Sequence, residues 1–183
     1  INSPVCSGTT LNLTASTIAS ASGYSWNGPN SYTSAVQNPS IGGVTTLASG
    51  TYSVTATVPG CPVSPAGTVS VTVNQTPAAP VASSNSPVCS GNDLSLTAST
   101  IGSSTYSWTG PGGFTSASQN PVIVAATSAN AGTYSVSATE NGCTGPNGTT
   151  AVTITPLPAA PTAGSNSPLC TGNTLNLTAS VIA

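Results

Sequence analysis

The sequence has almost no charged residues. It holds no lysine, arginine, histidine or methionine, and its only charged side chains are Asp93 and Glu140. Nucleic-acid binding and attachment to anionic membranes both depend on lysine and arginine, so both are excluded. General acid–base catalysis, calcium binding and phosphate-binding loops need side chains that are absent or isolated here. We therefore expect no enzyme activity, no catalytic residue, no metal and no cofactor.

Long hydrophobic runs and a targeting segment are also missing. No stretch approaches the roughly 18 apolar residues that a membrane-spanning helix needs. The sequence starts at Ile1 with neither an initiating methionine nor a basic, signal-like segment, so we expect it to be part of a longer chain. Serine and threonine hydroxyls, which hydrogen-bond water without charge, replace the missing charged groups.

Internal repeats organise what is present. The segment SPVCSG at Ser3–Gly8 returns at Ser86–Gly91, and SPLCTG follows at Ser167–Gly172. The motifs LxLTAS, YSW, QNP, GTYSV and GC recur at the same offset of 81 to 83 residues. A fixed period of this kind is typical of repeat architectures. It predicts two units of about 82 residues and the start of a third, with boundaries at 1–76 (first strand incomplete), 77–158 and 159–183.

The residue pattern inside each unit predicts strands. Tyr52, Val54 and Ala56 alternate with hydroxyl residues, as do the leucines of the LxLTAS motif, and Gly, Pro, Asn and Ser separate these runs. We expect an all-β fold of about seven short strands per unit, which is the pattern of a β-sandwich. Proline-rich linkers at Thr76–Pro87 and Leu157–Pro168 predict semi-rigid spacing between units.

The motifs VCSG, LxLTAS, YSW, GTYSV and GC together resemble an immunoglobulin-like (Ig-like) repeat of the PKD-like kind. Such tandem repeats occur in large secreted surface proteins of Bacteroidota, so the resemblance implies a bacterial, extracellular, cell-surface location. It also implies that Trp26 and Trp108 pack in the sandwich core, and that Tyr52 and Tyr134 form the tyrosine corner.

One departure from the Ig pattern concerns the usual disulfide between the two sheets. Its positions would fall at Ala15 with Val54, and at Ala98 with Val136. All four residues are apolar and none is cysteine. The cysteines of this chain therefore serve another purpose.

Two disulfide arrangements are compatible with the sequence. The disulfide candidates are Cys6, Cys61, Cys89, Cys143 and Cys170. In one arrangement the bridges form within units, joining Cys6 to Cys61 and Cys89 to Cys143, and Cys170 has its partner beyond the sequence. Either arrangement predicts an oxidising, extracellular setting.

The second arrangement joins neighbouring units. In an Ig-like topology the two cysteines of one unit lie at opposite poles, about a strand length of 20 Å apart, whereas a disulfide needs Cα atoms within about 7 Å. Stacking of successive units would place Cys6 against Cys143, and Cys89 against a cysteine outside the sequence. Bridges of this kind would stiffen the array.

The function predicted from these features is structural: a secreted extracellular filament or cell-surface fibre built from stacked Ig-like units. Its partners would be copies of itself, because an edge strand without charge is weakly protected against pairing with another edge. The segment 161–183 is a candidate for such strand addition. The alternative is the stalk or glycan-binding module of a bacterial adhesin, which would need exposed aromatic residues such as Tyr32 and Phe114. An accessory region of a large secreted enzyme is a third hypothesis.

Overall fold

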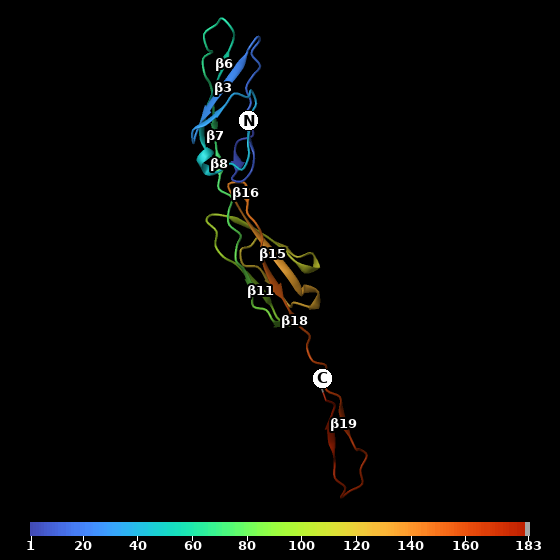
Figure 1. Ribbon diagram of the computed structural model, residues 1–183. Coiled ribbons are helices and arrows are strands. Elements are labelled where there is room, and N and C mark those ends of the chain that lie inside the picture. The colour runs from blue at the N-terminus through green and yellow to red at the C-terminus, as the bar shows by residue number, and fades with distance from the viewer. Residues whose placement is uncertain (182–183) are drawn as a thin grey trace.

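The computed structural model describes residues 1–181 and contains two β-sandwiches followed by a β-hairpin, arranged in a row (Figure 1). The predicted third unit, 159–183, ends in two residues that lie outside the described part. The all-β prediction is confirmed, since the only helical segments described are single 3-10 turns. None of the helical segments described for residues 1–181 has the length and hydropathy needed to cross a bilayer.

The first sandwich is built from strands β1 to β8. They are β1 (Val5–Cys6), β2 (Leu11–Asn12), β3 (Gly23–Gly28), β4 (Tyr32–Ser34), β5 (Ser40–Ile41), β6 (Gly50–Thr57), β7 (Gly67–Val71) and β8 (Val73–Asn74), with the 3-10 turn η1 (Thr46–Ala48). The main sheet has the order β4-β3-β6-β7, and β2 pairs with β5 opposite it. Strand β1 runs parallel to β8 and joins the first segment of the sandwich to its last.

The second sandwich is built from strands β9 to β18. They are β9 (Ala82–Ser84), β10 (Val88–Cys89), β11 (Leu94–Ala98), β12 (Thr105–Thr109), β13 (Thr115–Ser116), β14 (Val122–Ile123), β15 (Gly132–Glu140), β16 (Cys143–Thr144), β17 (Gly148–Val152) and β18 (Ile154–Thr155), with turns η2 (Pro111–Gly113) and η3 (Ser128–Asn130). Its main sheet has β13, β12 and β15 in order, with β16 and β17 both on β15. The opposite sheet has the order β14-β11-β9, and β10 runs parallel to β18.

The C-terminal hairpin consists of β19 (Ala163–Ser165) and β20 (Leu177–Ala179), which pair antiparallel with each other. The spacing of its motifs matches that of β9 and β11 in the second sandwich. No further strand covers either face of this hairpin within residues 1–181, so its apolar side chains are exposed.

Each sandwich has its own core, formed by the inward-facing residues of the alternating strands. Trp26 and Trp108 lie at the two centres, with exposed fractions of 1% and 0%. The remaining core residues of the first sandwich are Leu11, Leu13, Val44, Tyr52, Val71 and Val73. In the second they are Leu94, Leu96, Ala98, Tyr106, Ala126, Tyr134, Val136, Ala138, Val152 and Ile154.

The tyrosines of the GTYSV motif are anchored at the start of their strands. The Tyr52 hydroxyl donates a hydrogen bond to the Ala48 carbonyl at 3.0 Å, and the Tyr134 hydroxyl donates to the Asn130 carbonyl at 2.9 Å. Both bonds reach back four residues, which is the geometry of an Ig tyrosine corner. A side chain at Gly28 would collide with the Tyr52 ring, which explains the glycine two residues after Trp26.

Candidate functional site: the junction between the sandwiches

The first half of the junction is the end of the first sandwich that carries Cys6. Strand β1 pairs in parallel with β8 so that Cys6 lies opposite Asn74, the last residue of the final strand. The chain leaves the sandwich directly after this point. Cys6 is therefore fixed beside the linker that leads to the second sandwich.

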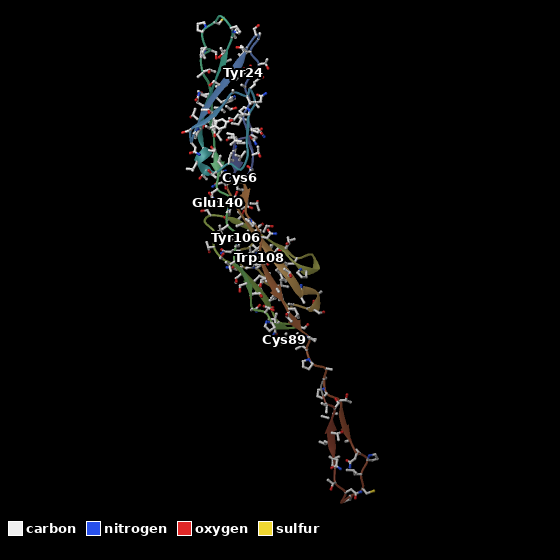
Figure 2. All side chains as sticks on the ribbon, in the orientation of Figure 1. Cys6, Tyr24, Cys89, Tyr106, Trp108 and Glu140 are labelled. Carbon is white, nitrogen blue, oxygen red and sulfur yellow. A yellow bond between two sulfur atoms is a disulfide. The ribbon has the colours of Figure 1, made fainter. Side chains whose placement is uncertain are left out.

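The second half is the turn between β15 and β16, which faces the first sandwich. Cys143 opens β16, pairs with Glu140 across this turn, and forms a disulfide with Cys6. The two Cα atoms are 5.6 Å apart, inside the range that a disulfide requires. Figure 2 shows Cys6 close to Glu140, whereas Cys89 lies at the far end of the second sandwich.

Hydrogen bonds reinforce the covalent link. The Asn74 side-chain amide donates to the Asn141 backbone carbonyl across the junction at 2.9 Å. On the first sandwich, the hydroxyl of Thr76 donates to the Ser7 carbonyl at 2.9 Å, and the Thr76 backbone N–H donates to the Ser7 hydroxyl at the same distance. The linker is thus hydrogen-bonded to the first sandwich at its first residue. This bonding and the bond across the junction hold the two sandwiches in a defined arrangement.

Of the two disulfide arrangements expected from the sequence, the structure has the one between units. Cys6 is bonded to Cys143 and not to Cys61, and Cys143 is not bonded to Cys89. The physical reason is the separation of the poles: in each sandwich the two cysteines lie at opposite ends. Among the described residues Cys61, Cys89 and Cys170 are free, exposed thiols.

The two carboxylates each have a structural contact. Asp93 accepts a hydrogen bond from the Ala125 backbone N–H at 3.0 Å. Glu140 is the last residue of strand β15, partly buried, and accepts from the Ser103 N–H at 3.3 Å. No cluster of three or more potential metal-ligating side chains occurs within residues 1–181.

The aromatic residues considered for glycan contact are half-buried. The Tyr32 ring packs edge-on against Tyr52, with ring centroids 5.7 Å apart, and the Phe114 ring packs against Tyr134 at 5.5 Å. These rings extend the core around the tyrosine corners. Neither ring is therefore a fully exposed aromatic residue.

Sequence reasoning missed the junction pair Asn74 and Asn141. The second unit has Thr155 at the position of Asn74, and the first has Pro59 at that of Asn141. The repeat pattern therefore carried no signal for this hydrogen bond. Only the disulfide half of the junction was visible from the sequence.

Comparisons with known proteins support the fold alone. No family model and no curated protein matches the sequence. A chain in the crystal structure of the mouse coronavirus receptor-binding domain complexed with its murine receptor is similar, with 12% identity, a TM-score of 0.52, and coverage of 82% of this chain and 96% of that one. Murine CEACAM1b is similar with 13% identity, a TM-score of 0.46, and 82% and 94% coverage. Together with the sheet order and the tyrosine corners, the likeness to the first of these two structures establishes an Ig-like fold.

Proposed function

We propose that this chain is a structural segment of an extracellular fibre or cell-surface filament, made of stacked Ig-like repeats of about 82 residues that associate with copies of themselves. The observation that carries the proposal is the disulfide between Cys6 and Cys143. A covalent bridge between two separately packed sandwiches resists bending and stretching, which is a mechanical property.

The same bridge can be repeated along a fibre. Cys89 has the place in the second sandwich that Cys6 has in the first, and Cys61 has the place of Cys143. Both are exposed thiols at opposite ends of the two-sandwich body. Joining Cys89 of one copy to Cys61 of another removes two protons and two electrons, which an oxidised thiol–disulfide oxidoreductase would accept.

Further features fit a fibre outside the cell. Persisting disulfides belong to oxidising compartments, and the absence of lysine and arginine removes every trypsin-type cleavage site. The resemblance to PKD-like repeats of secreted bacterial surface proteins supports the same location. In this proposal the units span 1–76, 77–158 and 159–183, and none of them is catalytic. The buried tryptophans count against a glycan-binding adhesin module.

Electron microscopy of the native, unreduced material tests the proposal. We expect uniform filaments with an axial repeat equal to one or two Ig-like units. Thiol reduction should make these filaments flexible or fragmented. Isolated particles or flexible strings before reduction would overturn the fibre function and favour the stalk of an adhesin.

A further inference from the structure

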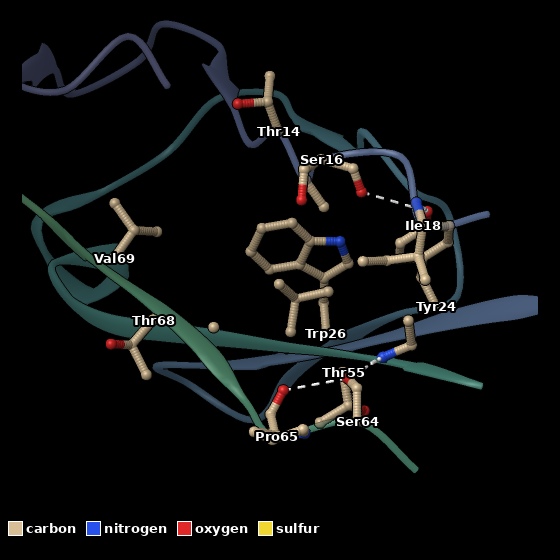
Figure 3. A pocket seen from close by; sticks show the side chains of 14 residues that line it. Thr14, Ser16, Ile18, Tyr24, Trp26, Thr55, Ser64, Pro65, Thr68 and Val69 are labelled. Atoms are coloured by element: carbon tan, nitrogen blue, oxygen red, sulfur yellow. Dashed lines mark hydrogen bonds between the residues drawn. The ribbon is translucent and has the colours of Figure 1, made fainter. Parts of the chain in front are cut away.

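The first sandwich has an open groove along one side of its core. One wall is the segment Thr14–Ser16 with Ile18, and the other is the segment Ser64–Val69. Tyr24, Trp26 and Val54 form the floor, and Figure 3 shows the Trp26 indole between the two walls. The groove has a volume of about 450 Å³.

In the second sandwich, the corresponding position is filled by the chain itself. Strand β9 pairs with β11 there, placing Ser84 opposite Leu96 and Ala82 opposite Ala98. The Ser99 N–H donates to the Val81 carbonyl at 3.0 Å, which extends this pairing. On the other side, the Gly148 backbone lies directly against the Pro80 carbonyl. The space between β11 and β17 that this segment fills is called the slot below. Pro77 and Pro80 are both buried in it.

Residue equivalence shows that the groove and the slot are the same site. Leu13–Ser16 repeats the sequence of Leu96–Ser99, and Gly67 has the place of Gly148 at the start of the last long strand. Ile1 has the place of Ser84, and its N-terminal amine donates to the Thr14 hydroxyl at 3.3 Å, so only the positions equivalent to Pro80–Ser83 would precede Ile1 in the numbering. Within residues 1–181, no strand lies on the Thr14–Ser16 edge of the first sandwich.

We propose that the groove binds the strand Pro161–Gly164 of a second copy of this chain, in the register that Pro80–Ser83 adopts in the second sandwich. Gly164 would then lie opposite Thr14, and Ala163 opposite Ala15, directly before the place that Ile1 has. This inference rests on the proposed self-association and supplies its contact surface. It assigns a donor strand, an acceptor groove and a pairing register.

The donor segment has the required chemistry and is accessible. The sequence Pro-Ala-Ala-Pro at 158–161 is identical to that at 77–80. Pro158 and Pro161 are exposed, whereas Pro77 and Pro80 are buried. Strand β19 pairs only with β20 among the described strands and its three residues are exposed, so its other edge is open to a partner.

The exchange gives the donor strand an equivalent partner segment and adds burial. Strand β19 now pairs with the LNLTAS segment Leu175–Ser180, and the groove would offer the identical LNLTAS segment Leu11–Ser16. Ala163 and Gly164 therefore exchange their partners Ala179 and Thr178 for the equivalent Ala15 and Thr14, whereas β20 loses its pairing with β19. In addition it gains the apolar floor and the second wall of the groove, which the hairpin lacks. Swapping identical elements in this way is a known low-cost route to association.

One residue limits how far the strand extends. Ser64 has the place of Gly145, where a side chain would collide with the Pro77 carbonyl in the second sandwich. The Ser64 hydroxyl already accepts a hydrogen bond from the Ala56 N–H at 2.9 Å. The donor segment therefore occupies the groove from Pro161 onward, and its residues before Pro161 pass outside Ser64.

The geometry of the exchange leads to an open assembly. The groove is in the first sandwich and the donor strand is in the C-terminal hairpin, beyond the second sandwich (Figure 1). A contact between two different surfaces is heterologous, and it produces a filament unless rotation closes it into a ring. Head-to-tail addition would thus place successive copies along one axis.

The decisive variant is Gly67→Ala. A Cβ at Gly67 has as its nearest neighbour Val54 Cγ1 at 3.7 Å, so the substitution fits the chain as it stands. At the equivalent Gly148, a Cβ would collide with the carbonyl of the inserted strand. Gly67→Ala should therefore preserve folding and block insertion. Gly42→Ala is the matched control, because a Cβ there meets nothing within 4 Å and Gly42 does not line the groove.

The experiment titrates a fluorescent peptide with the sequence of residues 157–166 into the dilute, intact chain and follows anisotropy. We expect saturable one-to-one binding to the native chain and to Gly42→Ala, and no binding to Gly67→Ala. A peptide with Asp in place of Pro161 should not bind, because the equivalent Pro80 is buried. In parallel, sedimentation of the concentrated chain should show large assemblies that Gly67→Ala abolishes.

The outcomes separate this inference from the proposed function. Absence of peptide binding overturns the groove as a strand acceptor, even if fibres are seen. Assemblies that persist in Gly67→Ala overturn strand exchange as their cause and leave the fibre function standing. Peptide binding without self-association overturns the second copy as donor, and the occupant is then a segment preceding Ile1 in a longer form of the same chain.

Discussion

The two sandwiches share their landmark residues but differ on the side where the groove lies. In the second sandwich, β11 runs over five residues with β9 beside it, and Ala98 and Val136 are buried. In the first, β2 has only two residues in regular pairing, and the equivalent Ala15 and Val54 are partly exposed.

The difference follows from one short segment. When Pro77–Ser84 lies between the two walls, it supplies hydrogen-bond partners for one and excludes water from the floor between them. In the first sandwich, where no strand of residues 1–181 lies between the walls, the wall has fewer residues in regular pairing, and Tyr24 and Val54 on the floor are partly exposed. One edge strand thus affects two properties: how many residues of the neighbouring strand are regularly paired, and how much of the adjacent core is buried.

The cysteines provide the sharpest comparison, because Cys143 is bridged and buried whereas its counterpart Cys61 is exposed and free. Cys143→Ser should lower the free energy of unfolding by up to about 5 kcal/mol, since the bridge closes a long loop. Cys61→Ser should change it by less than about 0.5 kcal/mol, as surface substitutions usually do.

The measurement is urea unfolding followed by tryptophan fluorescence in Trp26→Phe and Trp108→Phe backgrounds, so that each sandwich is observed separately. Cys6→Ser removes the same bond and should give the same loss as Cys143→Ser. Equal effects of Cys143→Ser and Cys61→Ser would contradict the bridge as the stabilising link between the sandwiches.

Two equivalent glycines test the segment that fills the slot. Gly148→Ala should destabilise the second sandwich by about 2–3 kcal/mol, because the new methyl group forces the Pro80 backbone out of its place. Gly67→Ala should leave the first sandwich within about 0.5 kcal/mol of the native chain. The same fluorescence-detected unfolding measures both variants. A loss of unfolding free energy in Gly67→Ala as large as that in Gly148→Ala would mean that the groove of the first sandwich is filled in solution.

A smaller effect is expected from the floor of the groove. Val136→Ala removes two buried methyl groups and should cost about 2 kcal/mol. Val54→Ala, at the equivalent but partly exposed position, should cost about half as much. Adding the peptide of residues 157–166 should increase the cost of Val54→Ala toward that of Val136→Ala. An unchanged difference in saturating peptide would show that the peptide does not cover Val54.

The fold was largely predictable from the sequence, and the junction only in part. Alternating Tyr52, Val54 and Ala56 indicated a strand, and the Ig resemblance indicated the positions of Trp26 and Trp108, because both signals are local. Which cysteine meets Cys6 depends on how two sandwiches stack, and the sequence left two arrangements open. The groove was not predicted, since the repeated motifs mark equivalent positions in the two units but do not show which of them a neighbouring strand covers.

The last comparison concerns pH. Burial raises the pKa of Tyr52 above the usual value of 10.0, with a smaller contribution from the neighbouring Tyr32, and burial also raises the pKa of Tyr134. A raised pKa in the folded state means that the folded chain retains these protons when the unfolded chain loses them. Stability should therefore be unaffected below about pH 10 and fall as pH rises beyond it.

On the acid side the chain has few groups to titrate, with two carboxylates and no histidine. We therefore expect an unfolding free energy that is nearly flat from mildly acidic pH to about pH 9 and declines above it. Unfolding in urea across this range measures the profile for each sandwich. Tyr52→Phe should remove the alkaline decline from the first sandwich and Tyr134→Phe from the second, at the cost of one hydrogen bond each. An alkaline decline that survives in both variants would mean that the corner tyrosines are not its source.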